Sequence, residues 1–174
     1  MGQYYYVVNV DKKEFLYPHK FGDGLKLMEF GSSGCGTMTG LAILLADGNG
    51  RGGGDIRSED EIIGSWAGDR IVIAGDYADT GRFIKKKDCE DLKDEATKTA
   101  IFVGLPLNYK KVNLHDVARA SFKDISLAVL LAMMDDKYLA DELSKDSFGN
   151  KNLVKTWFSS RRPRQNITSP SWRN

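Results

Sequence analysis

The chain has few of the residues that mark membrane segments, disulfide scaffolds and zinc sites. It contains two cysteines and two histidines among 174 residues. No apolar run approaches the roughly 20 residues that cross a bilayer, and the longest, 127–134, has the length of a buried helix. The first residues lack the basic segment followed by an apolar one that a secretory signal has. We therefore expect a soluble, cytoplasmic protein that does not enter a membrane.

The scarcity of cysteine and histidine also limits the chemistry. Without a signal segment, Cys35 and Cys89 are expected to be free thiols. His19 and His115 are not spaced to complete a zinc site with them, and neither histidine stands in a nucleophile pattern. Cys35 precedes a predicted helix, where a thiol becomes more acidic, but a small buried residue is the commoner role of cysteine. We expect no cofactor and no bound metal.

Charge separates the chain into a body and a tail. Residues 147–174 contain basic side chains and no acid, although the whole chain has a formal net charge of only +1. We expect one domain over 1–146, long enough to bury its own core, and a basic C-terminal extension over 147–174. The acidic body disfavours nucleic acid, because phosphate contacts need a positive face. A homo-oligomer, or a protein partner bound through the tail, stays open.

Apolar patterning predicts an α+β fold. We expect a small mixed or antiparallel sheet with an N-terminal hairpin, packed by helices mainly from the C-terminal half. Asn113 is expected to cap a helix, with Asp116 in its first turn. Strands are predicted over 4–10, 14–17, 25–30, 70–74 and 101–103. Helices are predicted over 37–46, 121–134 and 135–143.

The glycine-rich run 47–55 is the strongest candidate for a binding site. Five of its nine residues are glycine, with an arginine in the middle and an aspartate at each end. Such a loop loses much backbone entropy when it orders, and its unshielded amides can converge on an anion. Arg51 adds a guanidinium that can fork onto phosphate or carboxylate. A structural turn is the alternative. The residues expected to hold the anion are Asn49, Gly50, Arg51, Gly52 and Gly53.

Known glycine-loop motifs fit this run poorly. Gly48, Gly50 and Gly53 have the spacing of a dinucleotide fingerprint, but that loop follows a strand and opens a helix, whereas this run follows a predicted helix. The Gly-Lys-Ser or Gly-Lys-Thr of a Walker loop is absent. A calcium loop would have Arg51 at a ligand position and Ser58 where glutamate belongs. A generic cradle of amides for phosphate or carboxylate remains.

A second set of candidates flanks the predicted strand 70–74. Asp76 and Asp79 could pair to hold Mg²⁺ or to act as acid and base, and turn-capping aspartates are the alternative. Trp66 and Tyr77 are candidates to stack on a base or sugar, with a core position as the alternative for Trp66. The two Ala-Gly-Asp sequences around this strand predict two similar turns.

Four segments carry a resemblance. They are MGQYY, GLKLMEF, DGNGRGGGD and GSWAGDRIVIAGDYAD. Together they resemble a family of small, uncharacterised bacterial and phage proteins, over roughly the first half of the chain. The resemblance brings no activity with it. A phage setting would suit a role in host–phage conflict, such as the capture of a signalling nucleotide.

The expected function is non-catalytic binding of a small anionic ligand, such as a nucleotide, through the glycine-rich loop. Whether the protein is an enzyme stays open, because Asp76 and Asp79 offer the alternative of a metal-dependent phosphoester hydrolase. A third alternative is a protein-interaction module that acts through the basic tail. Most glycines lie in the first half of the chain, and we therefore expect the site there.

Overall fold

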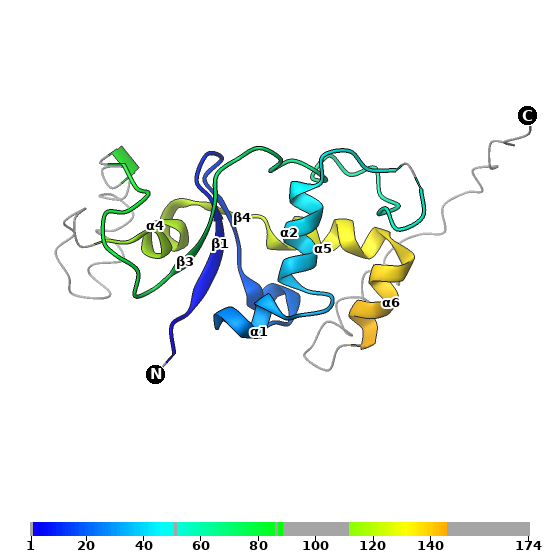
Figure 1. Cartoon of the computed structure of the whole chain (residues 1–174), viewed down its shortest axis with the longest axis horizontal. Helices are drawn as coiled ribbons and strands as arrows, with labels where there is room; N and C mark the ends of the chain where they lie inside the picture. Colours follow the sequence, from blue (N-terminus) through cyan, green and yellow to red (C-terminus); the bar gives the residue numbers. More distant parts are fainter. Residues whose placement is uncertain (1, 51, 86, 89–111, 146–174) are drawn as a thin grey trace, which may run out of the picture.

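The computed structural model describes residues 2–50, 52–85, 87–88 and 112–145. It confirms the α+β class, with one mixed four-stranded sheet and helices on either side of the strands (Figure 1). Arg51, Cys89, the predicted strand 101–103 and the basic extension 147–174 lie outside the described residues. None of the helices in the described ranges has the length and apolar composition needed to span a bilayer.

The sheet has the strand order β3-β1-β2-β4. β1 (Tyr5–Asn9) pairs antiparallel with β2 (Glu14–Leu16), which confirms the N-terminal hairpin. β1 also pairs antiparallel with β3 (Ile71–Gly75), and β2 pairs in parallel with β4 (Lys123–Asp124). The β-branched and aromatic side chains of β1 and β3 favour this pleated, half-buried setting. Because β1 is the one described strand that pairs with β3, β3 lies at an edge of the sheet.

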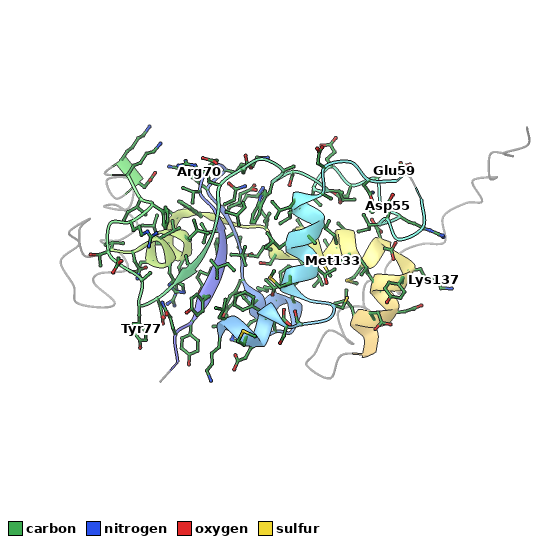
Figure 2. All side chains as sticks on the ribbon, in the orientation of Figure 1. Asp55, Glu59, Arg70, Tyr77, Met133 and Lys137 are labelled. Carbon is green, nitrogen blue, oxygen red and sulfur yellow. The ribbon has the colours of Figure 1, made fainter. Side chains whose placement is uncertain are left out.

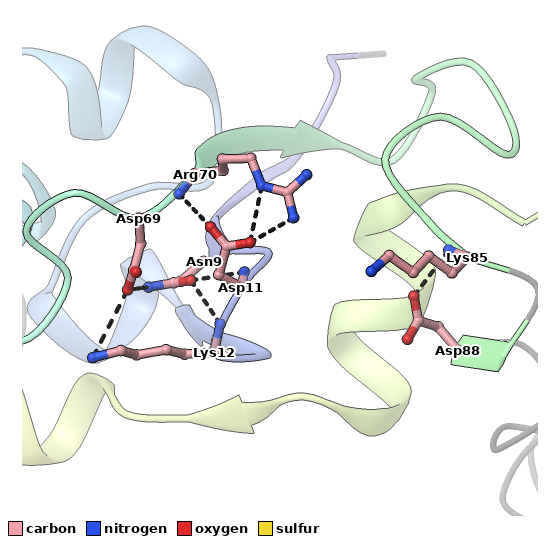
Figure 3. Close-up of polar contacts among 7 residues, drawn as sticks. All are labelled: Asn9, Asp11, Lys12, Asp69, Arg70, Lys85 and Asp88. Carbon is pink, nitrogen blue, oxygen red and sulfur yellow. Dashed lines mark hydrogen bonds and ion pairs between the residues drawn. The ribbon is translucent and has the colours of Figure 1, made fainter.

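A buried asparagine joins the hairpin turn to the start of β3 (Figure 3). Asn9 Oδ1 accepts from the amides of Asp11 and Lys12 at 3.0 and 2.9 Å, and Asn9 Nδ2 donates to Asp69 Oδ2 at 2.8 Å. Arg70 donates to Asp11 through its amide at 2.8 Å and through its guanidinium. These contacts hold β3 in register with β1.

Helical segments cover both faces of the sheet. They are η1 (Pro18–Phe21), α1 (Leu27–Gly31), α2 (Thr37–Leu45), α4 (Leu114–Ser121), α5 (Ser126–Asp135) and α6 (Lys137–Lys145). The predicted cap of α4 is confirmed, because Asn113 Oδ1 accepts from Asp116 N at 3.0 Å and Asn113 N donates to the Asp116 carboxylate at 3.3 Å. α4 lies on one side of the strands and α1, α2 and α5 lie on the other (Figure 1).

Alternation along β1 supplies two separate cores. Val7 and Leu16 face a cluster with buried side chains of α2 and α5, among them Leu44 and Val129. Tyr6 and Val8 face the opposite way, and a second cluster there includes Val117 of α4. Successive strand residues point to opposite faces. Both faces of the sheet are therefore covered.

The predicted strand over 25–30 is wrong, because this stretch forms α1. The strand was predicted from the apolar residues that follow the turn at 22–24. In the structure, the Lys26 amide donates to Glu29 Oε2 at 3.1 Å and caps the first turn of the helix. Only Phe30 in α1 is buried, while Leu27 and Met28 remain exposed.

The predicted helix over 121–134 begins five residues late, at Ser126. Lys123 N donates to Lys13 O at 2.9 Å, and Ile125 N donates to Phe15 O at 3.1 Å. These amides serve the sheet and cannot serve a helix at the same time. The two Ala-Gly-Asp sequences also differ in structure, because Gly68 has a φ of +84° whereas Gly75 ends β3.

Candidate ligand-binding site

The glycine-rich loop follows α2, as the sequence predicts. The side chain of Asn49 joins the two ends of the loop, at residues 49 and 56, which we call its neck. Asn49 Nδ2 donates to Ile56 O at 2.9 Å, and Ile56 N donates to Asn49 Oδ1 at 3.1 Å. Gly50 and Gly54 have φ values of +88° and +100°, which residues with a Cβ rarely adopt. Asn49 therefore shapes the loop, and glycine is required at its bends.

The loop forms one wall of a cavity of about 790 Å³. α2 forms a second wall, and the start of α6 forms a third. The lining residues are Thr39, Ala42, Ile43, Ala46, Gly48, Asn49, Gly54, Asp55, Ile56, Arg57, Asp136, Lys137, Tyr138, Leu139 and Asp141. Figure 2 shows Asp55 of the loop on the same side of the molecule as Lys137. The cavity therefore joins the first half of the chain to a helix of the second half.

The cavity combines an apolar wall with a ring and two cationic side chains. Ala42 and Ile43 of α2 give apolar surface, and Tyr138 lines the space while 70% of its surface stays exposed. Arg57 and Lys137 are the cationic residues of the lining, which also contains the carboxylates of Asp55, Asp136 and Asp141. The ring and the two cationic side chains offer contacts to a ligand that has both an aromatic part and an anionic part, while the carboxylates repel its anionic part.

Asp136 connects the end of the loop to α6. Its Oδ2 accepts from Arg57 N at 2.9 Å, and its Oδ1 accepts from the amides of Tyr138 and Leu139 at 2.9 and 3.1 Å. Burial by itself raises the pKa of Asp136, but these three hydrogen bonds outweigh it, so the pKa lies below its ordinary value. The carboxylate stays charged and fixes Tyr138 and Arg57 relative to each other.

The polar backbone of the loop is only partly used. Gly52 N donates to Asp55 Oδ2 at 3.1 Å, and Asp55 N donates to Gly52 O at 3.3 Å. The amides of Gly53 and Gly54, by contrast, donate to no other residue that the structure describes. An added Cβ at either glycine would meet nothing within 4 Å. A ligand can therefore approach this backbone without a side chain in the way.

The other predicted site residues lie away from the loop. Trp66 is fully buried, and its Nε1 donates to Glu14 Oε2 at 2.8 Å, so its ring belongs to the core. Tyr77 is exposed, but Figure 2 places it at the opposite end of the molecule from Asp55. Neither ring lines the cavity beside the loop.

Asp76 and Asp79 follow β3 at that opposite end. Asp76 Oδ1 accepts from Tyr4 N at 3.0 Å, and Asp76 O accepts from Asn113 Nδ2 at 2.9 Å. Asp79 is exposed. In the part of the chain that is described, no three histidine, cysteine, aspartate or glutamate residues are grouped closely enough to hold a metal ion. The hydrogen bonds of Asp76 join the N-terminus and α4 to the end of β3.

A second cavity of about 980 Å³ adjoins the first and shares Thr39, Tyr138 and Leu139 with it. His19, Asp23 and Cys35 lie in its lining. The Asp23 carboxylate accepts from the amide and hydroxyl of Thr37, both at 2.7 Å, and so anchors the start of α2. This contact is structural, because it fixes the first turn of α2, the helix whose Thr39 lines both cavities.

Tyr138, Lys137, Arg57 and Asp136 were not predicted from the sequence as site residues. A helix was predicted over 135–143, but nothing in the sequence places it beside the glycine-rich loop. The comparisons add no relative to guide the assignment: no protein-family model, no curated protein and no solved structure matches the chain. The cavity between the loop and α6 is thus the candidate site of this α+β structure.

Proposed function

We propose that the protein binds a small anionic ligand with a flat aromatic part, such as a nucleotide, between the glycine-rich loop and α6, and that it releases this ligand unchanged. One observation carries the proposal: loop glycines, the exposed ring of Tyr138 and the cationic Lys137 line a single cavity. Its volume of about 790 Å³ falls in the range of roughly 300–1,000 Å³ that holds small molecules.

The anionic end of the ligand is assigned to the loop. The amides of Gly53 and Gly54 meet no acceptor among the described residues, and Gly54 lines the cavity together with Arg57 and Lys137. The first turn of α6 is unsuited to this task, because the carboxylate of Asp136 already accepts from its amides. A phosphate or carboxylate would thus be bound by backbone amides of the loop and by cationic side chains.

The aromatic end of the ligand is assigned to Tyr138. Stacking of a base on an aromatic side chain contributes about 1–3 kcal/mol, and Tyr138 has 70% of its surface exposed for such a contact. Ala42, Ile43 and Leu139 supply the surrounding apolar surface. The ring then gives affinity for bases in general, and the loop gives preference for a charged ligand.

The chemistry of the lining favours release without turnover. Among the described residues that line the cavity there is neither histidine nor cysteine. Asp136 is a poor proton carrier near neutral pH, because its hydrogen bonds hold its pKa below the ordinary value. In a phage setting, such a protein would act by sequestering a signalling nucleotide.

Calorimetric titration with inorganic phosphate, adenosine, AMP and a cyclic dinucleotide tests the proposal. We expect a nucleotide to bind more tightly than phosphate or adenosine alone, and to be recovered chemically intact by chromatography. Tyr138→Ala should weaken nucleotide binding by roughly 5- to 150-fold, the equivalent of one lost base stack. Equal affinity for all four compounds, or binding of none, would contradict the proposal.

Tyr77→Ala is the matched control. Tyr77 is 68% exposed against 70% for Tyr138, so both substitutions remove an exposed tyrosine ring. Tyr77 lies at the opposite end of the molecule from the loop (Figure 2). Binding that falls equally in the two variants would show that the cavity beside the loop is not the site.

A further inference from the structure

β3 presents an apolar strand at the edge of the sheet. Its five residues, Ile71–Gly75, contain no charge, and Ile73 is 40% exposed. No described strand pairs with its outer side. Natural proteins usually protect such an edge with a charged residue, a proline or a bulge, because an open edge pairs with further strands. This strand has neither a charge nor a proline, which points to a partner at its outer side.

The register shows which backbone groups face outward. Val10 N donates to Arg70 O and Asp76 N donates to Tyr4 O, both at 3.0 Å. Hydrogen-bonded and non-hydrogen-bonded pairs alternate along an antiparallel ladder. With Val7 opposite Ile73 in this register, the even-numbered residues of β3 bond to β1. The amides of Ile71, Ile73 and Gly75 therefore point away from β1.

The same strand is complementary to itself. When two copies of β3 lie antiparallel with Ile73 at the centre, Ile73 faces Ile73 of the second copy, and Val72 faces Ala74. Arg70 then lies opposite Asp76 of the second copy, at both ends of the paired region. Residues directly opposite on antiparallel strands share a face and lie within contact distance. The Arg70 side chain is 67% exposed although it also contacts Asp11 of its own chain.

We infer that the protein forms a two-fold symmetric dimer in which two β3 strands pair antiparallel about Ile73 and join the two sheets. A second copy of this chain is the partner that satisfies all three observations. It supplies acceptors for the outward amides, covers Ile73 and sets an opposite charge against each end of the strand. Sliding the pairing by two residues keeps the hydrogen bonds but places Arg70 opposite an apolar residue. The charges therefore select one register.

Charge exchange between two variants tests the inference. An Arg70→Asp homodimer would set two carboxylates against each other at each end of the paired strands, and an Asp76→Arg homodimer would set two guanidinium groups there. Mixing the two variants pairs opposite charges again in a heterodimer. By sedimentation velocity, we expect each variant alone to dimerise at least roughly tenfold more weakly than the natural chain, and the mixture to recover. Lys20→Asp, a reversal at an exposed position of η1, should change nothing.

Three results of this experiment would overturn the inference. They are a natural chain that stays monomeric up to millimolar concentration, a dimer that neither reversal weakens, and two folded variants whose mixture fails to associate. Each variant also loses a contact within its own chain, to Asp11 or to Tyr4, so its folding is checked by circular dichroism.

A measurement on the natural chain avoids reliance on the variants. Amide hydrogen exchange at Ile71 and Ile73 should slow as the protein concentration rises, because dimerisation gives these outward amides acceptors. Exchange at Val72 and Ala74, which already bond to β1, should change much less. Exchange at Ile71 and Ile73 that does not depend on concentration would overturn the inference, whatever the variants do.

Discussion

At both ends of the molecule, a polar side chain hydrogen-bonds to the backbone and fixes a turn, but the two turns differ in the space beside them. At one end, Asn49 closes the neck of the glycine-rich loop through hydrogen bonds to both backbone groups of Ile56. At the other end, Asp76 bonds to Tyr4 and Asn113 and closes the end of β3. The first arrangement borders a cavity that is lined by an exposed ring and by both cationic and acidic residues. A hydrogen-bonded turn therefore becomes a candidate site only when another element leaves space beside it.

The largest effect is expected at Trp66, which belongs to neither end. Trp66→Ala should reduce the free energy of unfolding by about 3–5 kcal/mol, because it removes a fully buried indole. Trp66→Phe should lose about 1–2 kcal/mol, chiefly the hydrogen bond to Glu14. Urea denaturation measures both values. A Trp66→Ala variant that keeps its stability but no longer binds nucleotide would place this ring in the site.

A smaller effect separates the two ends directly. Asn49→Ala and Asp76→Ala each remove side-chain hydrogen bonds to the backbone, so each should cost about 1–2 kcal/mol of stability. Nucleotide affinity should fall only for Asn49→Ala, because the loop then loses the two hydrogen bonds to Ile56 that join its ends. Urea denaturation and calorimetric titration measure the two quantities. The comparison fails if Asp76→Ala also loses affinity, since that would connect the far end to the ligand.

The smallest effect concerns pH and the end of the molecule around α4. The ring of His115 stacks on Tyr6 with centroids 4.2 Å apart, and neither of its nitrogens has a hydrogen-bond partner among the described residues. Burial lowers the pKa of His115 below 6.5, while Asp116 and Asp76 partly oppose this shift and Arg119 adds to it. Below pH 6.5 the unfolded chain therefore binds this proton more tightly than the folded chain does.

Stability should accordingly fall as the pH drops from about 6.5 toward the folded-state pKa of His115. His115→Phe, which keeps a ring but does not titrate, should remove this part of the pH dependence. Urea denaturation between about pH 5 and pH 8, the range in which histidine titrates, measures the difference between the two proteins. Parallel stability curves for the natural chain and the variant would show that His115 is not buried in its neutral form.

Local sequence signals predicted most of the described elements. The hairpin, α2, β3 and the Asn113 cap depend on β-branched runs, helix formers and a short polar side chain, all of which act within a few residues. The predictions over 25–30 and 121–125 failed because a capping carboxylate and the hydrogen bonds of β4 act against the apolar pattern.

The candidate site was predicted only in part. The glycine-rich loop was identified, because unshielded backbone is visible in the sequence. Tyr138 and Lys137 could not be identified, since they come from a helix far along the chain whose position depends on tertiary packing and on the bonds of Asp136. The candidate cavity also takes in α6 of the second half of the chain, whereas the sequence placed the site in the first half. Arg51, central to that prediction, lies outside the described residues.

Mapping the bound nucleotide by backbone amide chemical shifts is the most direct test of the central claim. The nucleotide to titrate is the one that raises the melting temperature most. The account predicts that the largest shifts fall in residues 48–57 and 137–139, on either side of the cavity, while residues 76–79 stay unchanged. Shifts concentrated at 76–79 would move the site to the opposite end of the molecule and contradict the account.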